Sequence, residues 1–143
     1  MSEQNIALVD RAIAEVWNQG NYSTLDELVS NDIVVHGSTP ANDIHGPEGV
    51  RQFYATLRNA FPDLHFTSED QIASGNRVVT RWTASGTHRG DFQGIAPTGK
   101  QVRVSGVDID RIVDGKVVEC WSIADYLYLL QQLGAVPAPE QTK

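Results

Sequence analysis

Asp125 is the carboxylate of this sequence best placed for acid–base chemistry. It follows a predicted strand in which alternate side chains share one face, namely Val117, Glu119, Trp121, Ile123 and Asp125. The apolar members indicate that this face points inward, which would bring Asp125 to the inner rim of a pocket. Poor solvation there would raise the pKa of the carboxyl group and make it a better base near neutral pH. Asp is also a favoured helix N-cap, and the two roles can coexist.

Two histidines are candidates to bind or protonate an oxygen beside such a base. His36 directly follows the apolar run Ile33–Val35 and precedes a flexible stretch. His88 lies where a long predicted strand opens into a loop, so it could reach a pocket mouth. We therefore group His36 and His88 with Asp125 as predicted catalytic residues.

Aromatic and histidine side chains are the candidates for substrate binding. Trp82 shares the parity of a predicted strand face with Val78, Thr80 and His88, so it is either a pocket wall or a core residue. The predicted substrate-binding residues are Trp82, Trp121, Phe53 and His65.

Asp108 and Asp110 alternate with Val107 and Ile109 on the third long strand, and two interpretations remain open. If Gly106 marks a bulge that switches phase, the valine and isoleucine point inward and the aspartates face solvent or a partner subunit. If it does not, two carboxylates enter the pocket, as a two-acid mechanism would require. The solvated arrangement is the one we expect.

The composition of the chain restricts the classes of protein to which it can belong. The 143 residues carry 11 basic and 18 acidic side chains, a formal net charge of −7, which disfavours nucleic-acid binding. No signal peptide or membrane-spanning run is recognisable, so we expect a cytoplasmic location. Cys120 is the one cysteine, and no metal-ligand spacing or phosphate-binding loop occurs. We expect neither a metal nor a cofactor.

Helical periods come first in the chain and strand periods follow. Helices are predicted from Ile6 to Val16, with a short second helix opened by a Thr24–Glu27 capping box, and from Pro47 to Pro62. Extended runs follow at 64–73, 77–87, 101–113 and 116–123, joined by the hairpin signals Ser74-Gly75-Asn76 and Asp114-Gly115, and a last helix spans 125–133. This order predicts one α+β domain over 1–143, flexible at 1–4 and 136–143, with helices on one face of a bent sheet.

Four segments resemble the SnoaL-like polyketide cyclase family. They are FPDL at 61–64, RWTASGTHRGDF at 81–92, PTGK at 97–100 and DGKVVECW at 114–121. The resemblance covers about Gly46 to Gly134. It implies a cone-shaped α+β fold like that of nuclear transport factor 2, with a strongly curved, mainly antiparallel sheet enclosing a pocket.

The same resemblance implies cofactor-independent ring closure by intramolecular aldol condensation, with a single aspartate as the acid–base residue. Asp125 looks like the counterpart of that aspartate. The expected ligand is a small hydrophobic or aromatic carbonyl metabolite, and the alternative is a non-catalytic small-molecule-binding protein. A homodimer through the sheet is also implied, in which outward Arg103, Arg111 and the third-strand aspartates could pair.

Overall fold

The computed structural model describes residues 2–37 and 43–137. The helical elements are α1 (Ser2–Arg11), a π-helical continuation (Ala12–Asn18), a 3-10 turn (Tyr22–Thr24), α2 (Leu25–Leu28), α3 (Gly46–Ala60) and α4 (Tyr126–Leu133). The strands are β1 (Val29–His36), β2 (Ile44–His45), β3 (His65–Ser74), β4 (Arg77–Thr87), β5 (Gln101–Val113) and β6 (Lys116–Ala124). Met1 and residues 138–143, part of the predicted flexible ends, lie outside the described residues, whereas α1 already begins at Ser2.

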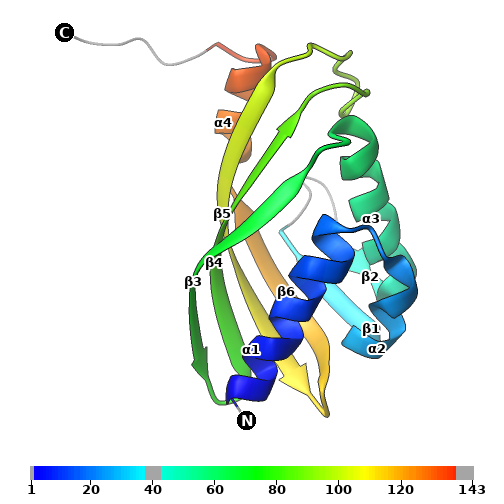
Figure 1. Cartoon of the computed structure of the whole chain (residues 1–143), viewed down its shortest axis with the longest axis vertical. Helices are drawn as coiled ribbons and strands as arrows, with labels where there is room; N and C mark the ends of the chain where they lie inside the picture. The colour runs from blue at the N-terminus through cyan, green and yellow to red at the C-terminus, as the bar shows by residue number, and fades with distance from the viewer. Residues whose placement is uncertain (1, 38–42, 138–143) are drawn as a thin grey trace, which may run out of the picture.

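All six strands form one sheet in the order β2-β1-β6-β5-β4-β3. Every pairing is antiparallel except that of β1 with β6, which is parallel. Figure 1 shows the sheet as a strongly bent layer with α1 and α3 on one side, and α4 beside the upper part of β5. The predicted α+β architecture is therefore confirmed, and the bend leaves space between the sheet and the helices.

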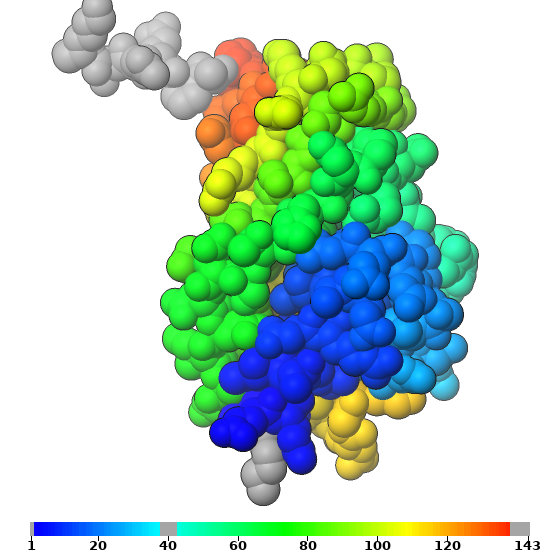
Figure 2. Space-filling view, viewed as in Figure 1, coloured from blue at the N-terminus to red at the C-terminus, as the bar shows by residue number. Residues whose placement is uncertain are grey.

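The N-terminal helical segment covers the lower part of the sheet's inner face. Val9, Ile13 and Val16 bury the apolar stripe that the sequence predicted, and they join the main core. In the space-filling view this segment (blue) lies against β3 (green) along one side (Figure 2). Within the described part of the chain, no helix is both long and apolar enough to cross a membrane.

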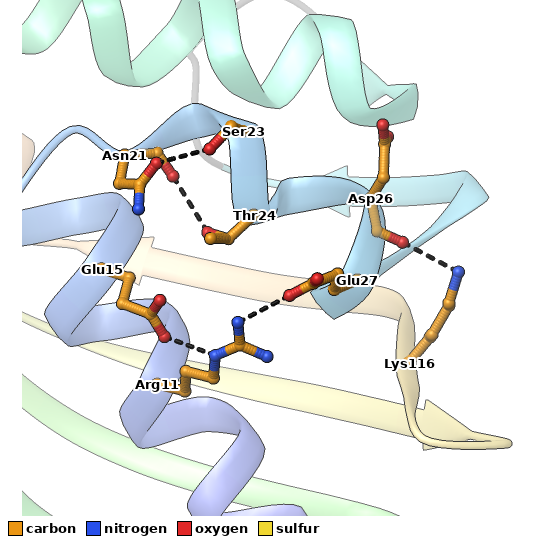
Figure 3. A network of polar contacts seen from close by, with 8 residues as sticks. All are labelled: Arg11, Glu15, Asn21, Ser23, Thr24, Asp26, Glu27 and Lys116. Atoms are coloured by element: carbon orange, nitrogen blue, oxygen red, sulfur yellow. Dashed lines mark hydrogen bonds and ion pairs between the residues drawn. The ribbon is translucent and has the colours of Figure 1, made fainter.

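Polar contacts tie this segment to the neighbouring elements. The Arg11 guanidinium bridges the carboxylates of Glu15 and Glu27, and its Nη2–Glu27 Oε2 distance is 2.6 Å. Lys116, at the start of β6, donates to the backbone oxygen of Asp26 at 2.8 Å (Figure 3). These contacts join α1, α2 and the β5–β6 hairpin at the molecular surface.

Most predicted element boundaries hold to within a few residues, and both hairpin turns are confirmed. Asp114 and Gly115 have φ values of 51° and 74°, the left-handed pair that a two-residue hairpin needs. The capping box is wrong: the Thr24 hydroxyl donates to the Asn21 carbonyl oxygen at 2.9 Å and does not cap α2. The two-residue strand β2 carried no periodic signal and was not predicted.

Two of the four segments that carry the family resemblance, FPDL and RWTASGTHRGDF, make scaffold contacts. The Asp63 carboxylate accepts from the Thr87 backbone N–H at 2.6 Å and from its hydroxyl at 2.7 Å, which joins the start of β3 to the end of β4. The backbone N–H groups of Arg89 and Gly90 donate to the Ala60 carbonyl at the end of α3. A Cβ on Gly90 would lie 2.3 Å from the Asn59 carbonyl oxygen, so this close approach requires glycine.

A β-bulge at Val118 reverses the predicted faces of β6. Arg111 pairs with Glu119 but Ile112 pairs with Val117, so Val118 is the extra residue. Beyond it Cys120 is buried, whereas Ile123 is 73 % exposed. The inference that Trp121, Ile123 and Asp125 share the inner face is therefore wrong, because strand parity does not continue through a bulge.

No such bulge interrupts β5, and the expected solvated position of its aspartates is also wrong. The β4–β5 register runs without a shift from Arg77↔Arg111 to Thr87↔Gln101. Asp108 and Asp110 therefore keep the inward parity of Val102 and Val104, and both are buried. They cannot pair with arginines across a sheet interface.

Gly106 serves a different purpose from the predicted phase switch. A Cβ at this position would lie 2.2 Å from the Trp82 ring. Because glycine has no side chain, the Trp82 indole can pack directly on β5, next to Asp108.

Candidate active site

The bend of the sheet encloses a cavity of about 290 Å³ between β4, β5, β6 and the helices. Most of its wall is aromatic or aliphatic. The larger lining side chains of these kinds are Trp17, Phe53, Tyr54, Leu57, Phe61, Leu64, Phe66, Trp82, Phe92, Tyr126 and Leu129. Among the described residues that line it, Asp108 is the one charged side chain. The cavity is thus an apolar container with a single carboxylate.

Asp108 is held in place by donors on both neighbouring strands. Trp82 Nε1 on β4 donates to Asp108 Oδ1 at 3.0 Å, and the Ser122 side chain on β6 also forms a hydrogen bond with this carboxyl group. Asp108 is only 3 % exposed. Burial raises its pKa above the ordinary value, while the bonds from Ser122 and Trp82 act in the opposite direction. The hydrogen bonds therefore fix the orientation of the Asp108 carboxyl group, and burial stabilises its protonated form.

Phe53 and Trp82, two of the predicted substrate-binding residues, lie in the cavity wall. The α3 helix carries Phe53 and Tyr54 to the wall, and Trp17 stacks on Tyr54 with ring centroids 5.6 Å apart. Burial raises the pKa of the Tyr54 hydroxyl well above its usual range, so this group stays protonated and is a hydrogen-bond donor at neutral pH.

Asp125 lies outside the cavity wall, at the N-cap of α4. Its carboxylate accepts a hydrogen bond from the Tyr128 backbone N–H at 3.2 Å, and the side chain is exposed. The N-cap interpretation is confirmed. The parity argument that placed this carboxylate at the inner rim is corrected by the Val118 bulge, after which Ser122 and Ala124 line the cavity.

His36 and Trp121 meet each other away from the cavity wall. Their rings stack with centroids 5.6 Å apart, and the Arg77 guanidinium lies 5.1 Å from the Trp121 ring centroid. His36 Nε2 lies 2.7 Å from Glu119 Oε2, and Nδ1 lies 2.9 Å from Asp43 Oδ2. This arrangement is an ion-pair cluster on the outer side of β6.

His88 is fully buried behind Phe61, with ring centroids 5.5 Å apart, and is not among the lining residues. The Thr98 backbone N–H donates to His88 Nδ1 at 3.1 Å, which assigns the proton of the neutral ring to Nε2. His65 is exposed at the start of β3. The structure therefore brings none of the predicted histidines into the cavity wall.

Sequence reasoning missed Asp108 as the cavity carboxylate and Ser122 as its neighbour. The signal was present, since Val102, Val104, Asp108 and Asp110 share one parity over an uninterrupted strand. The prediction that the aspartates face solvent depended instead on a phase-switching bulge at Gly106, which β5 does not contain. Among the described residues no group of three His, Cys, Asp or Glu side chains is arranged to hold a metal ion.

Comparison with known proteins agrees with this architecture. The model of the SnoaL-like polyketide cyclase family matches residues 7–133. The fold is the cone-shaped α+β fold of nuclear transport factor 2-like proteins, and the chain belongs to the SnoaL-like polyketide cyclase family.

Individual relatives match over most of their length. The aklanonic acid methyl ester cyclase DnrD of Streptomyces peucetius is 28% identical over 91% of this chain and 92% of its own. The nogalonic acid methyl ester cyclase of Streptomyces nogalater is 28% identical over 85% of this chain and 92% of its own. The crystal structure of AclR from Streptomyces galilaeus matches with a TM-score of 0.86 and 33% identity, over 99% of this chain and 87% of that one.

Proposed function

We propose that this protein is a cofactor-independent enzyme that moves a proton on a small, neutral, aromatic or hydrophobic carbonyl compound, with ring closure by intramolecular aldol condensation as the reaction. The observation that carries the proposal is the single buried carboxylate of Asp108 in an otherwise apolar cavity. The family of curated cyclases to which the chain belongs supports the same chemistry.

Asp108 is the acid–base residue in this proposal. Its carboxylate removes a C–H proton next to a carbonyl group and forms an enolate. The enolate carbon attacks a second carbonyl of the same molecule, and the proton on Asp108 then passes to the new alkoxide. A raised pKa suits both steps, because the group must accept a proton and release it again near neutral pH.

Tyr54 is the proposed donor to the developing oxyanion. Its hydroxyl stays protonated, and the residue lines the cavity together with Asp108. Lys, Arg and His are missing from the described lining residues, so a free carboxylate on the substrate would meet no counter-charge. Neutral ketones and esters fit such a wall best.

The first test measures proton removal on a probe, 2-tetralone, a neutral bicyclic ketone. In D2O its α-hydrogens exchange for deuterium, and 1H NMR follows the loss of signal. The wild type should accelerate this exchange above the buffer rate. Asp108→Asn should reduce the acceleration by about a hundredfold or more, the usual contribution of a positioned general base.

Asp125→Asn is the matched control, since it makes the same change on an exposed aspartate. We expect it to keep the exchange activity. Loss of exchange in Asp125→Asn, with retention in Asp108→Asn, would return the acid–base role to the residue that the sequence predicted. Incubation with aklanonic acid methyl ester, followed by chromatography of the product, then asks whether ring closure occurs.

A non-catalytic small-molecule-binding protein is the second candidate. It is favoured by the fact that Trp82 and Ser122 already satisfy Asp108, as hydrogen-bonded partners do for a purely structural carboxyl group. In that case calorimetry would show that 2-tetralone binds without exchange. Exchange of every tested ketone would stay at the buffer rate in the wild type and in Asp108→Asn alike.

A further inference from the structure

Asp110 is a second buried carboxyl group on the inner face of β5, two positions beyond Asp108. Consecutive inward positions on a strand are separated by roughly 6.6–6.8 Å between Cα atoms. Both side chains are below one-tenth exposed. Asp110 forms no ion pair in the described part of the chain, and its hydrogen-bond partner is the Cys120 thiol across the strand pair.

Asp108 and Asp110 share an inner cavity of about 60 Å³, between the sheet and the N-terminal helices. This volume exceeds what one water molecule needs, and two carboxyl groups, a thiol and hydroxyls line it, so water can bridge the pair. Trp17, Phe53, Tyr54, Asp108 and Ser122 line the inner cavity as well as the main one. Asp108 therefore stands between the substrate space and Asp110.

The groups that face this pair are few and uncharged. The titratable ones are Tyr54 from α3 and Cys120 from β6, and burial raises the pKa of both, so both remain neutral. The lining residues contributed by α1, its π-helical continuation, α2, β1 and β2 are Val9, Ala12, Val16, Trp17, Leu25, Val29, Ile33, Val35 and Ile44, none of them ionisable. On β4, Val78 and Thr80 lie opposite the two aspartates.

Burying two ionised carboxylates without a cation in such surroundings has a large free-energy cost, from lost solvation and from mutual repulsion. One proton removes the repulsion. The donors decide where it resides, because the indole N–H of Trp82 and the Ser122 side chain stabilise a charge on Asp108, whereas Asp110 has only a weak thiol donor. Consistent with this, burial followed by the charge of Asp108 raises the pKa of Asp110 to about 7.

We propose that Asp108 and Asp110 share one proton at neutral pH, held chiefly by Asp110, and that Asp110 is a positioning residue that sets the protonation state of Asp108. The catalytic part of this inference rests on the proposed function. When Asp108 takes a substrate proton, the pair passes from one proton and one negative charge to two protons and none. Return of that proton to the alkoxide restores the starting state, so Asp110 keeps its own proton throughout.

The direct test is a pH titration of the aspartate carboxyl carbons by 13C NMR, on the full chain and without substrate. In the wild type, Asp110 should still be protonated well above pH 5. In Asp108→Asn the midpoint of Asp110 should fall by about one unit or more, because the neutral amide removes the repulsion from the charge of Asp108. Asp125→Asn, which changes an exposed carboxylate, should leave the midpoint of Asp110 where it was.

The reciprocal variant tests which of the two groups holds the proton. In Asp110→Asn the midpoint of Asp108 should stay where it was, since Asp110 is already neutral while Asp108 ionises in the wild type. A fall of the Asp108 midpoint in Asp110→Asn, an unchanged Asp110 midpoint in Asp108→Asn, or two carboxyl groups that both ionise below pH 5 in the wild type, would overturn the proposal.

The activity readout separates this inference from the proposed function. With 2-tetralone in D2O, Asp110→Asn should retain exchange and the acidic limb of the rate–pH profile. It should lose the change in rate near neutral pH that the ionisation of Asp110 causes in the wild type, where a second charge makes Asp108 a stronger base. A merely structural role would change the rate without removing this inflection, which would overturn the positioning role. If the coupled titration is found but Asp108→Asn exchanges as the wild type does, the proton-sharing pair stands and the proposed function fails.

Discussion

The Trp82 indole crosses the β4–β5 pair over Gly106 and donates its N–H to Asp108 at 3.0 Å. The backbone partner of Trp82 is Gly106 itself, while Asp108 pairs with Thr80. The hydrogen bond therefore runs diagonally along the inner face. One tryptophan both forms part of the cavity wall and fixes the orientation of its carboxyl group.

Trp82→Phe removes the N–H donor and keeps an aromatic ring. Because this hydrogen bond favours the ionised form of Asp108, its loss should raise the pKa of Asp108 further, by roughly one unit. Carboxyl-carbon NMR measures the shift. Trp121→Phe, made on the outer side of β6, is the control and should leave Asp108 unaffected.

Gly106→Ala tests whether the indole needs the space above β5. The new Cβ would lie 2.2 Å from the ring, so either Trp82 or the strand must move. We expect a loss of about 1–3 kcal/mol in the free energy of unfolding, measured in urea. Ser105→Ala, at the exposed neighbouring position, should change it by less than about 0.5 kcal/mol. Equal stabilities for the two variants would contradict this account of Gly106.

The buried aspartates predict that stability falls as the pH rises. The folded pKa of Asp110 is about 7, above its ordinary value of 3.8, so the native state binds more protons than the unfolded chain between these pH values. The stability contributed by the neutral carboxyl group is present below pH 3.8 and is lost as the pH rises through 7. In that window the slope approaches about 1.4 kcal/mol per pH unit.

Asp110→Asn should flatten this slope, because the amide does not titrate. Urea unfolding at pH 5, 6, 7 and 8 measures the slope. The free energy of unfolding of the variant should increase most, relative to that of the wild type, at pH 8. Asp125→Asn should retain the wild-type slope. A wild type that becomes steadily more stable from pH 5 to pH 8 would count against a neutral Asp110.

The pKa of His36 should lie above its ordinary value of 6.5, because the hydrogen bonds that its ring donates to the carboxylates of Glu119 and then Asp43 favour the imidazolium. The added stability is present below pH 6.5 and is lost as the pH rises through the folded pKa. Glu119→Gln should therefore lower the midpoint of the His36 ring, followed by 1H–15N NMR. Glu69→Gln, on β3, is the control. A midpoint that stays the same in Glu119→Gln would rule out the ion pair.

The family resemblance predicts a homodimer through the sheet, and the outer face carries exposed apolar side chains. They are Ile72, Val107, Val113 and Ile123. Sedimentation equilibrium should give twice the chain mass of 15.7 kDa. Ile123→Glu should shift the protein toward a monomer, whereas Leu127→Glu on α4 should not. A monomer mass for the wild type would refute the prediction.

Periodicity and turn chemistry were enough to predict the long strands and α3. The two hairpins have sequence signals that act locally, since glycine and aspartate permit the left-handed backbone that each turn needs. The apolar stripe on α3 likewise predicts which side of that helix packs inward. The family resemblance then predicted the strongly curved, mainly antiparallel sheet with a pocket, but not the order of the strands within it.

The positions of the site residues depended on features with no local signal. Nothing in Lys116–Ala124 distinguishes Val118 as the extra residue, because a bulge is defined by the register with β5 and β1. The burial of Asp108 likewise depends on partners supplied by other strands, Trp82 and Ser122. A sequence read one segment at a time therefore assigns both aspartates to solvent and Asp125 to the pocket.

The bulge at Val118 sets which residues of β6 face the cavity, because the strand beyond it is offset by one residue. Deletion of Val118 would leave a regular ladder with the same faces. If the chain instead gained one residue between Glu119 and Cys120 and the hairpin kept its register, the rest of the strand would turn over as a unit, bringing Trp121 and Ile123 to the cavity and sending Cys120 and Ser122 outward. An insertion of a single codon could thus replace the chemistry around Asp108 without altering any residue that now lines the cavity. Insertions and deletions in this hairpin are therefore a route by which a protein of this fold can acquire a different reaction.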